Sequence, residues 1–560
     1  MKIRDKYDIL NNFHFKLLFI ISLFSSYLIG LTHFDITNSL DWNKYEQYLI
    51  LFTSENVTLT ESQGTLYFFI ITIFTSFHES ILGPHNLFQV INTGIQLGNF
   101  VLYSTGLFGL FKLLKSYEVS QNNILISLSI LNFFPPMLYL RLTMKPEIFA
   151  FCILPFAILL TKKIILKDNL TNSILLSALL AIILSTKGSI IGMTVLTFLV
   201  LFQKDLNILL SNKKLIFFTI GITFLLNLEN FMITGKFIFE NVVTSNYLNK
   251  AGLKFFYFVD LKLLLTDPYK HLHSNSFLSI VLLDTFNDYF DFFWDNDESY
   301  FIQNRSLYFN NFFIQKYLRE YIGIFLTLFV YLNFLKEIVV KNKYKNYFKL
   351  PFIGYLVLVV NSLGFPSKNF DPETGDLFKV HYIAFLLAIA FVFYLVNVLN
   401  QNSSKRYLLI LLLPIFIFFI GFPKSYDTLL SNQVIVKFNH SELCYLTFTQ
   451  NENCRNKKLN TCVFDPVLYK LDYESEIRTI PSKSTYFIPI ELEKDGKIFY
   501  PRSREECLKF YDYGFNYKSK RSLQIISNKI PFISISVLLS VILLSLSNLW
   551  IMRKLNQSIS

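Results

Sequence analysis

Long apolar runs separated by short polar segments recur along most of this chain. An α-helix rises about 1.5 Å per residue, so roughly 20 apolar residues cross the hydrocarbon core of a membrane. About twelve runs approach or exceed that length, and each predicts a membrane-spanning helix. They lie near residues 15–32, 90–111, 122–140, 147–161, 172–186, 188–203, 215–234, 321–335, 350–365, 381–400, 407–423 and 529–550.

The composition agrees with this pattern and excludes an ordinary soluble protein. Hydrophobic residues make up 52% of the chain and charged residues only 16%, which is typical of polytopic membrane proteins. The net charge of +12 does not indicate nucleic-acid binding, because the lysines and arginines form short clusters between apolar runs. No small-residue cleavage site follows the first run, so we expect an uncleaved first helix.

The basic clusters predict the topology. They are Lys2/Arg4/Lys6, Lys112/Lys115, Lys162/Lys163/Lys167, Lys204/Lys213/Lys214, Lys341/Lys343/Lys345/Lys349, Lys405/Arg406 and Arg553/Lys554. The run 65–77, at about 13 residues, is too short to cross the membrane. If it lies on the membrane surface, every cluster faces the cytoplasm, as the positive-inside rule requires. Both termini are then cytoplasmic, and the outer segments are 33–89, 137–147, 235–320, 366–380 and 424–528.

The charges that could carry chemistry gather at the predicted outer surface. The stretch "HFDITNSLDWNKYEQYL" follows the first span and carries Asp35 and Asp41. Between Ser173 and Val200 only Lys187 is charged, and it lies in the break "STKGS". Ion-coupled transporters usually carry ionisable residues or broken helices near the midplane. This pattern favours an enzyme at the outer membrane surface.

The order of these elements resembles the GT-C superfamily of integral membrane glycosyltransferases, in particular the bacterial lipid-linked sugar and aminoarabinose transferases. Asp41, followed four residues later by Tyr45, resembles the acid of the family's first outer loop. The segment "GTLYFF" stands where the family has a proline-containing "PLYY" element, without the proline. Lys145, Pro146 and Glu147 resemble the basic, proline and acidic pattern of the second outer loop.

A later element, "FKVHYIAFLL", resembles the family's basic and aromatic helix start, with Lys379, His381 and Tyr382. The resemblance covers residues 15–235 and, more loosely, 366–423. It implies transfer of a sugar from a polyprenyl-phosphate donor to an acceptor glycan, lipid or protein outside the cytoplasm.

The chemistry of such a transfer suggests roles for individual residues. A carboxylate must take the acceptor proton as its oxygen attacks, and Asp41 is the first candidate for this general base. Asp35 is the second candidate, and Glu147 is a third site acid that could orient Lys145 or the sugar hydroxyls. The alternative for both aspartates is that they hydrate the loop or cap a helix.

Donor binding requires groups that hold the phosphate leaving group at headgroup level. The predicted substrate-binding residues are Tyr45, Arg141, Lys145, Lys187, Lys379, His381 and Tyr382. For each lysine or arginine, a lipid-headgroup contact by a snorkelling side chain is an equal alternative. The sequence identifies no certain cofactor, and it leaves a divalent cation open.

An acidic and aromatic patch, 284–301, includes Asp284 and Asp288 at helical spacing. It predicts an interfacial outer helix, which either walls an active or cation site or is simply a solvated face. Four cysteines fall in the segment 424–528: Cys444, Cys454, Cys462 and Cys507. They indicate either two disulfides in an oxidising compartment or free thiols. Short β-rich runs and the turn signal "EKDGK" predict a small α+β or β module there.

We therefore expect an all-α membrane bundle with interfacial helices in the first outer loop, formed by residues 1–423. The outer module 424–528 follows, and residues 529–560 form the last span and a cytoplasmic tail. The predicted location is a bacterial inner membrane, with the active site on the periplasmic face. Two alternatives stay open: an O-antigen polymerase or ligase, and a transporter or flippase of lipid-linked sugars. Asn132 and Asn361, which lie in spans, could line a transport path or form hydrogen bonds between helices.

Overall fold

The structure is a computed structural model, and it describes a defined part of the chain. The described residues are 3–33, 48, 63–82, 87–167, 169–235, 253–266, 276–286, 321–340, 342–364, 380–401 and five short strands between 435 and 499. Within these ranges, the side chains near several helix ends are not described.

The described chain is mostly helical. The helices are α1 (Ile3–His33), α3 (Thr65–Leu82), α4 (Leu87–Lys115), α5 (Gln121–Leu131), α6 (Pro135–Leu142), α7 (Glu147–Leu166), α8 (Leu170–Leu184), α9 (Gly188–Leu201), α10 (Leu206–Ser211), α11 (Lys213–Thr234), α12 (Leu253–Tyr257), α13 (Leu261–Thr266), α14 (Phe277–Asp284), the helix Tyr321–Val339, α16 (Lys345–Phe348), α17 (Leu350–Gly364), the 3₁₀ helix η6 (Val380–Ile383) and α18 (Ala384–Gln401). Every predicted span up to residue 400 lies on one or two of these helices.

Among the described residues, five helices are long and apolar enough to cross a membrane. They are Gly94–Lys115, Glu147–Leu166, Lys213–Thr234, Tyr321–Val339 and Ala384–Gln401. The predicted spans 407–423 and 529–550 lie outside the described residues. The membrane character of the chain is therefore supported, and the count of about twelve spans stays a prediction.

Local sequence signals set several helix boundaries. Ser120 begins α5 by accepting a hydrogen bond from Asn123 N, and Asn169 caps α8 in the same way. Helix α11 ends at Gly235, which adopts the left-handed conformation with φ 69°. Pro135 and Pro136 begin α6 and interrupt the predicted span 122–140, because proline cannot continue a helix but suits its first turn.

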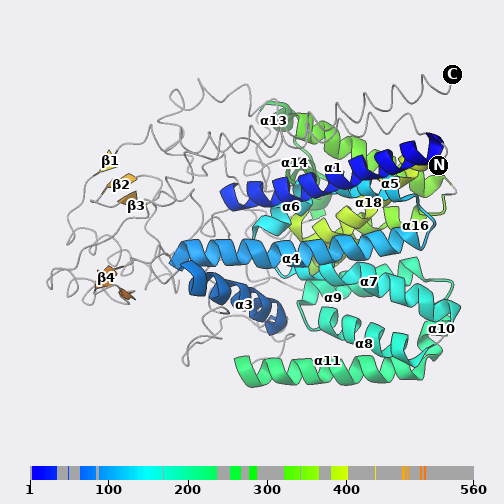
Figure 1. Cartoon of the computed structure of the whole chain (residues 1–560), viewed down its shortest axis with the longest axis horizontal. Coiled ribbons are helices and arrows are strands. Elements are labelled where there is room, and N and C mark those ends of the chain that lie inside the picture. The colour runs from blue at the N-terminus through cyan, green and yellow to red at the C-terminus, as the bar shows by residue number, and fades with distance from the viewer. Residues whose placement is uncertain are drawn as a thin grey trace.

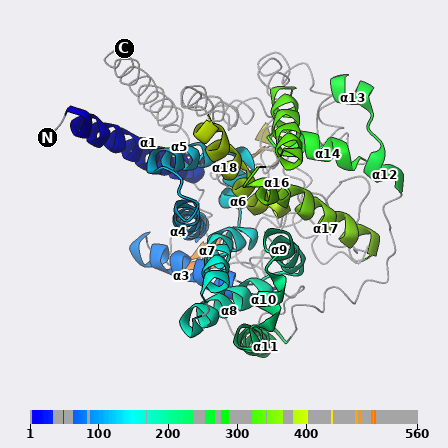
Figure 2. The same cartoon turned by 90° about the vertical axis from the view of Figure 1, so that its right-hand side faces the viewer.

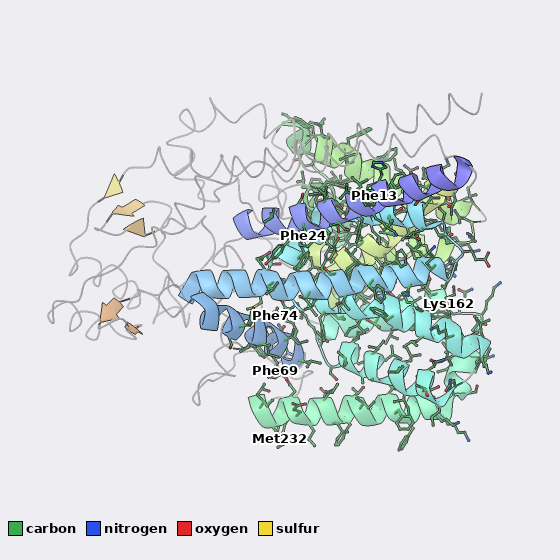
Figure 3. All side chains as sticks on the ribbon, in the orientation of Figure 1. Phe13, Phe24, Phe69, Phe74, Lys162 and Met232 are labelled. Carbon is green, nitrogen blue, oxygen red and sulfur yellow. The ribbon has the colours of Figure 1, made fainter. Side chains whose placement is uncertain are left out.

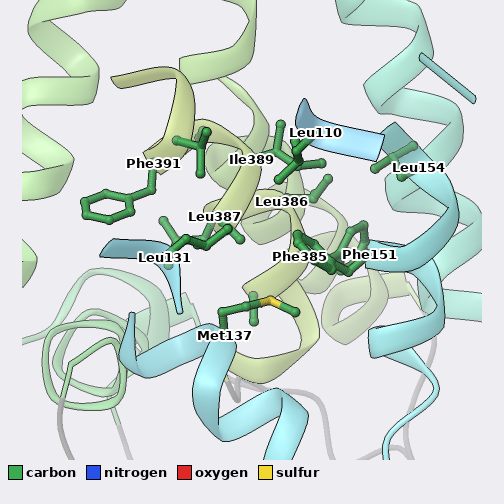
Figure 4. Close-up of a cluster of buried hydrophobic side chains, with 14 of the residues drawn as sticks. Leu110, Leu131, Met137, Phe151, Leu154, Phe385, Leu386, Leu387, Ile389 and Phe391 are labelled. Atoms are coloured by element: carbon green, nitrogen blue, oxygen red, sulfur yellow. The ribbon is translucent and has the colours of Figure 1, made fainter. Parts of the chain in front are cut away.

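The helices run side by side, with α4, α7 and α18 in the interior of the bundle (Figure 1, Figure 2). From Ala384 to Leu395, every residue of α18 is buried. Its side chains meet those of α4, α5, α6 and α7, as Leu110, Leu131, Met137 and Phe151 show in Figure 4. Such interdigitation of branched and aromatic side chains is what holds the interior together.

Several basic clusters gather at one end of the bundle, which we call the basic end. Lys162, near the end of α7, donates a hydrogen bond to Ser116 Oγ (3.0 Å) and lies 3.3 Å from the centroid of the Tyr117 ring. The Tyr117 hydroxyl lies 2.9 Å from the hydroxyl of Tyr347 on α16. Lys162 is labelled at this end in Figure 3. The ends of α4 and α7 and helix α16, all lysine-rich, are thus brought together, as the positive-inside rule predicts.

Helix α3 lies against the first part of α4, away from the basic end (Figure 1). The two helices approach closely at Gly94, where an added Cβ would lie 2.6 Å from Thr75 Cα. The apolar part of α3, Thr65–Phe77, is among the helices too short for the span criterion. Helix α3 itself is longer than the predicted run, with 18 residues. Its non-spanning position on the membrane surface stays a prediction.

The described strands all fall in the predicted outer module. Strand β1 (Ile435–Val436) pairs in parallel with β2 (Lys470–Asp472), which pairs antiparallel with β3 (Glu476–Ile477). Strands β4 (Leu492–Lys494) and β5 (Lys497–Phe499) form an antiparallel pair. The sequence between β4 and β5 is Asp-Gly, the pair that favours a two-residue hairpin turn.

The four module cysteines, Cys444, Cys454, Cys462 and Cys507, lie outside the described residues. The α+β or β module and its disulfides therefore stay predictions. The cysteine that the structure does describe, Cys152 on α7, is buried and carries no disulfide.

Candidate functional site

A buried ion pair lies where α7 and α9 begin, at the end of the bundle opposite the basic end. Lys187 Nζ lies 2.8 Å from Glu147 Oε1. The side chain of Glu147 is 0% exposed and that of Lys187 is 17% exposed. The Lys187 ammonium also lies 4.6 Å from the centroid of the Tyr382 ring, in η6. Three residues predicted for the site, far apart in the sequence, are thus in contact.

The local sequence explains why these two charges occupy helix starts. Glu147 is the first residue of α7, after Pro146 at the N-cap. A carboxylate at this position is stabilised by the positive end of the helix dipole. Lys187 is the N-cap of α9, with an extended backbone that separates α8 from α9. The "STKGS" break therefore places a lysine against the acid that begins α7.

The segment before α3 joins the pair through Gly64. Gly64 N donates a hydrogen bond to Thr186 O (2.8 Å), beside Lys187. A Cβ at Gly64 would lie 2.0 Å from Ser185 O, so only glycine permits this approach. One residue earlier, Gln63 N donates to the hydroxyl of the buried Tyr48 (2.7 Å).

Tyr67, on α3, connects the same region to the segment between α6 and α7. Its hydroxyl donates to Asn99 Oδ1 (3.0 Å) on α4. Asn99 Nδ2 in turn donates to the carbonyl oxygens of Arg141 and Thr143, both at 2.8 Å. Burial raises the pKa of Tyr67 well above its ordinary value, and the negative charge of Glu147 raises it further. Tyr67 is therefore a neutral hydrogen-bond donor close to the ion pair.

The side chain of Arg141 points into the bundle. Its guanidinium donates to Ser26 Oγ (2.9 Å) and to the carbonyl oxygen of Ser26, on α1. It lies 5.1 Å from the centroid of the Tyr103 ring, and its side chain is almost fully buried. These contacts hold α6 against α1 and α4, and a role of Arg141 in substrate binding stays a prediction.

Several predicted site residues lie outside the described residues: Asp35, Asp41, Tyr45, Asp288 and Lys379. For His381 and Asp284 the backbone is described and the side chain is not. The choice of catalytic base therefore stays a prediction. Lys145 is described and is buried, two residues before Glu147.

The predicted acidic outer helix begins where α14 ends. Helix α14 is apolar, and Thr285 and Phe286, which follow its last residue, are fully buried. The Phe286 ring meets that of Phe134 at 5.5 Å between centroids, at the break between α5 and α6. The start of the patch 284–301 thus packs into the bundle, and the role of the rest stays open.

The structure adds three residues that the sequence reasoning did not select: Gly64, Tyr67 and Asn99. Gly64 and Tyr67 lie in "GTLYFF", a segment recognised only as part of the resemblance. Asn99 is a polar residue in an apolar run, a weak signal that hydrogen bonding between helices also explains.

No group of three or more potential metal ligands from His, Cys, Asp and Glu occurs among the residues that the structure describes. No protein family, curated protein or solved structure matches this chain. Fold and site together define the chain as a mostly helical protein with membrane-spanning character. It carries an ion pair between Glu147, at the start of α7, and Lys187, at the start of α9, with Gly64 bonded beside it.

Proposed function

We propose that this protein is a membrane glycosyltransferase of the GT-C type. It transfers a sugar from a polyprenyl-phosphate donor to a glycan, lipid or protein acceptor on the periplasmic side of a bacterial inner membrane. The observation that carries the proposal is the Glu147–Lys187 pair, with the Tyr382 ring beside Lys187 and with Tyr67 close enough for the charge of Glu147 to raise its pKa. These residues come from four of the segments on which the resemblance, or the prediction of an outer active site, rests.

The charge of the cluster suits a phosphate-bearing donor. The described cations of these segments are Lys187, the buried Lys145 and Arg141, whose guanidinium bonds to Ser26, and the described acid is Glu147. A positive excess at an apolar membrane boundary attracts anionic headgroups and opposes charge build-up on a departing phosphate. Lys187 is the most accessible of the three cations. We therefore assign it the first contact with the donor phosphate.

The proposed reaction is a direct displacement at the anomeric carbon. The acceptor oxygen forms a bond to that carbon as the bond to the phosphate oxygen breaks. The acceptor proton passes to Asp41, and the polyprenyl phosphate leaves with the bonding electron pair. Asp41 acts only in this step, whereas Lys379 would hold the donor before and during it.

The test is transfer of radiolabelled sugar from membrane lipids, in a strain that lacks the native copy. Asp41→Asn is nearly isosteric but cannot take the proton, so transfer should fall on the order of 10²-fold or more. Polyprenyl-phosphate binding should persist. Asp35→Asn should cost less, and Lys379→Ala should weaken both donor binding and rate.

Three results would contradict the proposal. If Asp41→Asn and Asp35→Asn both keep normal transfer, the first outer loop does not supply the base. If no sugar transfer depends on the protein, the transporter or flippase alternative gains. Transfer of a whole preassembled glycan chain, rather than a single sugar, would favour the O-antigen polymerase or ligase.

A further inference from the structure

One oxygen of the buried ion pair has no partner. Glu147 Oε1 accepts from Lys187, but Oε2 is buried and has no hydrogen-bond partner among the described residues. A buried carboxylate oxygen without a donor is costly. Such an orphan acceptor points to a donor that binds from outside the chain.

Neighbouring groups of the protein are already engaged. The Tyr67 hydroxyl donates to Asn99 Oδ1, and Gly64 N donates to Thr186 O. The Lys187 ammonium has three hydrogens, of which one points to Glu147 Oε1. The pair therefore presents one vacant acceptor, Oε2, next to further donors on Lys187 Nζ.

From this arrangement we infer that Glu147 and Lys187 bind two adjacent hydroxyl groups of the transferred sugar. One hydroxyl donates to Glu147 Oε2, and its neighbour accepts from Lys187 Nζ. Vicinal hydroxyls on a sugar ring suit this pair because Oε2, the acceptor, belongs to the same carboxylate whose other oxygen, Oε1, lies 2.8 Å from the donor Lys187 Nζ. The inference rests on the proposed function and names the part of the substrate that this site recognises.

Other ligand chemistries fit less well. A phosphate would place its negative charge against the Glu147 carboxylate, and an amine would place its charge against the Lys187 ammonium. A neutral hydroxyl can donate to the first and accept from the second without repulsion. Lys187 is the more exposed member of the pair, so the sugar enters past the ammonium. Because only one of its three hydrogens points to Glu147 Oε1, Lys187 Nζ can donate both to the sugar hydroxyl and to the donor phosphate, which lies away from Oε2.

The test compares sugar phosphates with their deoxy analogues. Purified protein is titrated with glucose, galactose and mannose 1-phosphates, with monodeoxy analogues of each and with inorganic phosphate, and binding is followed by the thermal unfolding temperature. At least one hexose phosphate should bind more tightly than inorganic phosphate. Removing one hydroxyl of an adjacent pair should weaken its binding about 10-fold or more, the cost of a lost hydrogen bond to a charged group.

We call this loss of affinity, from a sugar phosphate to its deoxy analogue, the deoxy penalty. Glu147→Gln should abolish the deoxy penalty. The amide oxygen can still accept from Lys187, but the amide nitrogen in the place of Oε2 cannot accept from a hydroxyl. Glu229→Gln is the matched control, because Glu229 is an exposed acid near the end of α11, and it should keep the full penalty. If Glu147→Gln does not purify as a folded protein, Glu147→Asp is measured instead. Its side chain is one methylene shorter, so the acceptor oxygen lies farther from the hydroxyl and the deoxy penalty should fall.

The inference is wrong if the deoxy penalty survives in the Glu147 variants. It is also wrong if no sugar phosphate binds the wild-type protein more tightly than inorganic phosphate. Sugar transfer, measured separately, distinguishes this failure from failure of the proposed function. Transfer that depends on Asp41, with an unchanged penalty in Glu147→Gln, removes only the hydroxyl subsite. A penalty that vanishes in Glu147→Gln without any transfer removes only the proposed function.

Discussion

The contact between Gly64 and the start of α9 gives a sharp prediction for Gly64→Ala. The added Cβ would lie 2.0 Å from Ser185 O and 2.9 Å from Thr186 Cα. Real Cβ atoms essentially never approach another heavy atom closer than 3.0 Å, so the two backbones must separate by about 1 Å. Backbone atoms on both sides leave no flexible side chain that could move instead.

The expected cost has two parts. Overpacking of this kind typically costs about 1–3 kcal/mol. Separation also weakens the hydrogen bond from Gly64 N to Thr186 O, which leaves buried groups unpaired at about 1–3 kcal/mol. We expect the free energy of unfolding to fall by roughly 2–5 kcal/mol, seen as a lower thermal unfolding temperature in detergent or nanodiscs.

Gly188→Ala is the matched control. Gly188 begins α9, one residue after Lys187, and an added Cβ meets nothing within 4 Å. Its φ is not positive, since the only positive-φ glycine among the described residues is Gly235. Alanine should therefore be neutral or stabilising by up to about 1 kcal/mol.

If the proposed activity holds, the rate of sugar transfer should differ between Gly64→Ala and Gly188→Ala in the same direction as their stability. A shift of about 1 Å at Lys187 can cost up to about 10²-fold in rate, so Gly64→Ala should lose transfer while Gly188→Ala keeps it. Equal stability and equal transfer in the two variants would refute the reasoning, because the first loop would then not be fixed to the Lys187 loop.

Three further predictions follow from the same contacts. Lys187→Met should destabilise the protein by about 3–5 kcal/mol, because it leaves the fully buried Glu147 unpaired. Glu147→Leu should cost less, because Lys187 is partly exposed, and the double variant should cost less than the sum. A double-mutant cycle on thermal unfolding measures the coupling, and additive effects would contradict it. Asn99→Ala should lower the free energy of unfolding by about 2–4 kcal/mol, since the Tyr67 hydroxyl and the carbonyl oxygens of Arg141 and Thr143 lose their bonds to Asn99. An unfolding curve that matches the wild type would contradict this prediction. Single-cysteine labelling should find position Lys343 accessible from the cytoplasm and Asn369 from outside, and the reverse result would overturn the topology.

The sequence by itself determined the solvent in which this chain folds and the ends of many of its helices. Apolar runs and low charge gave the membrane class, because burying backbone in lipid leaves the helix as the simplest solution. Local signals such as Ser120 and Gly235 fixed helix ends through capping. The lysine clusters predicted a shared end, and the contacts of Lys162 with Ser116 and Tyr117 agree with it.

The site depended on the tertiary structure, because its contacts join residues far apart in the chain. Glu147, Lys187 and Tyr382 were each selected from sequence as separate candidates, and nothing in their spacing shows that the first two form an ion pair. Arg141 looked like an outer-surface cation, but its hydrogen bonds run inward to Ser26.

Gly64 shows most clearly what the sequence could not reveal. A glycine before an apolar run is common at a helix start, and its importance comes from a backbone about 120 residues away that approaches to within a hydrogen bond. Periodicity and composition describe how a segment meets its solvent. Which segments then meet one another is decided by the packing of the whole bundle.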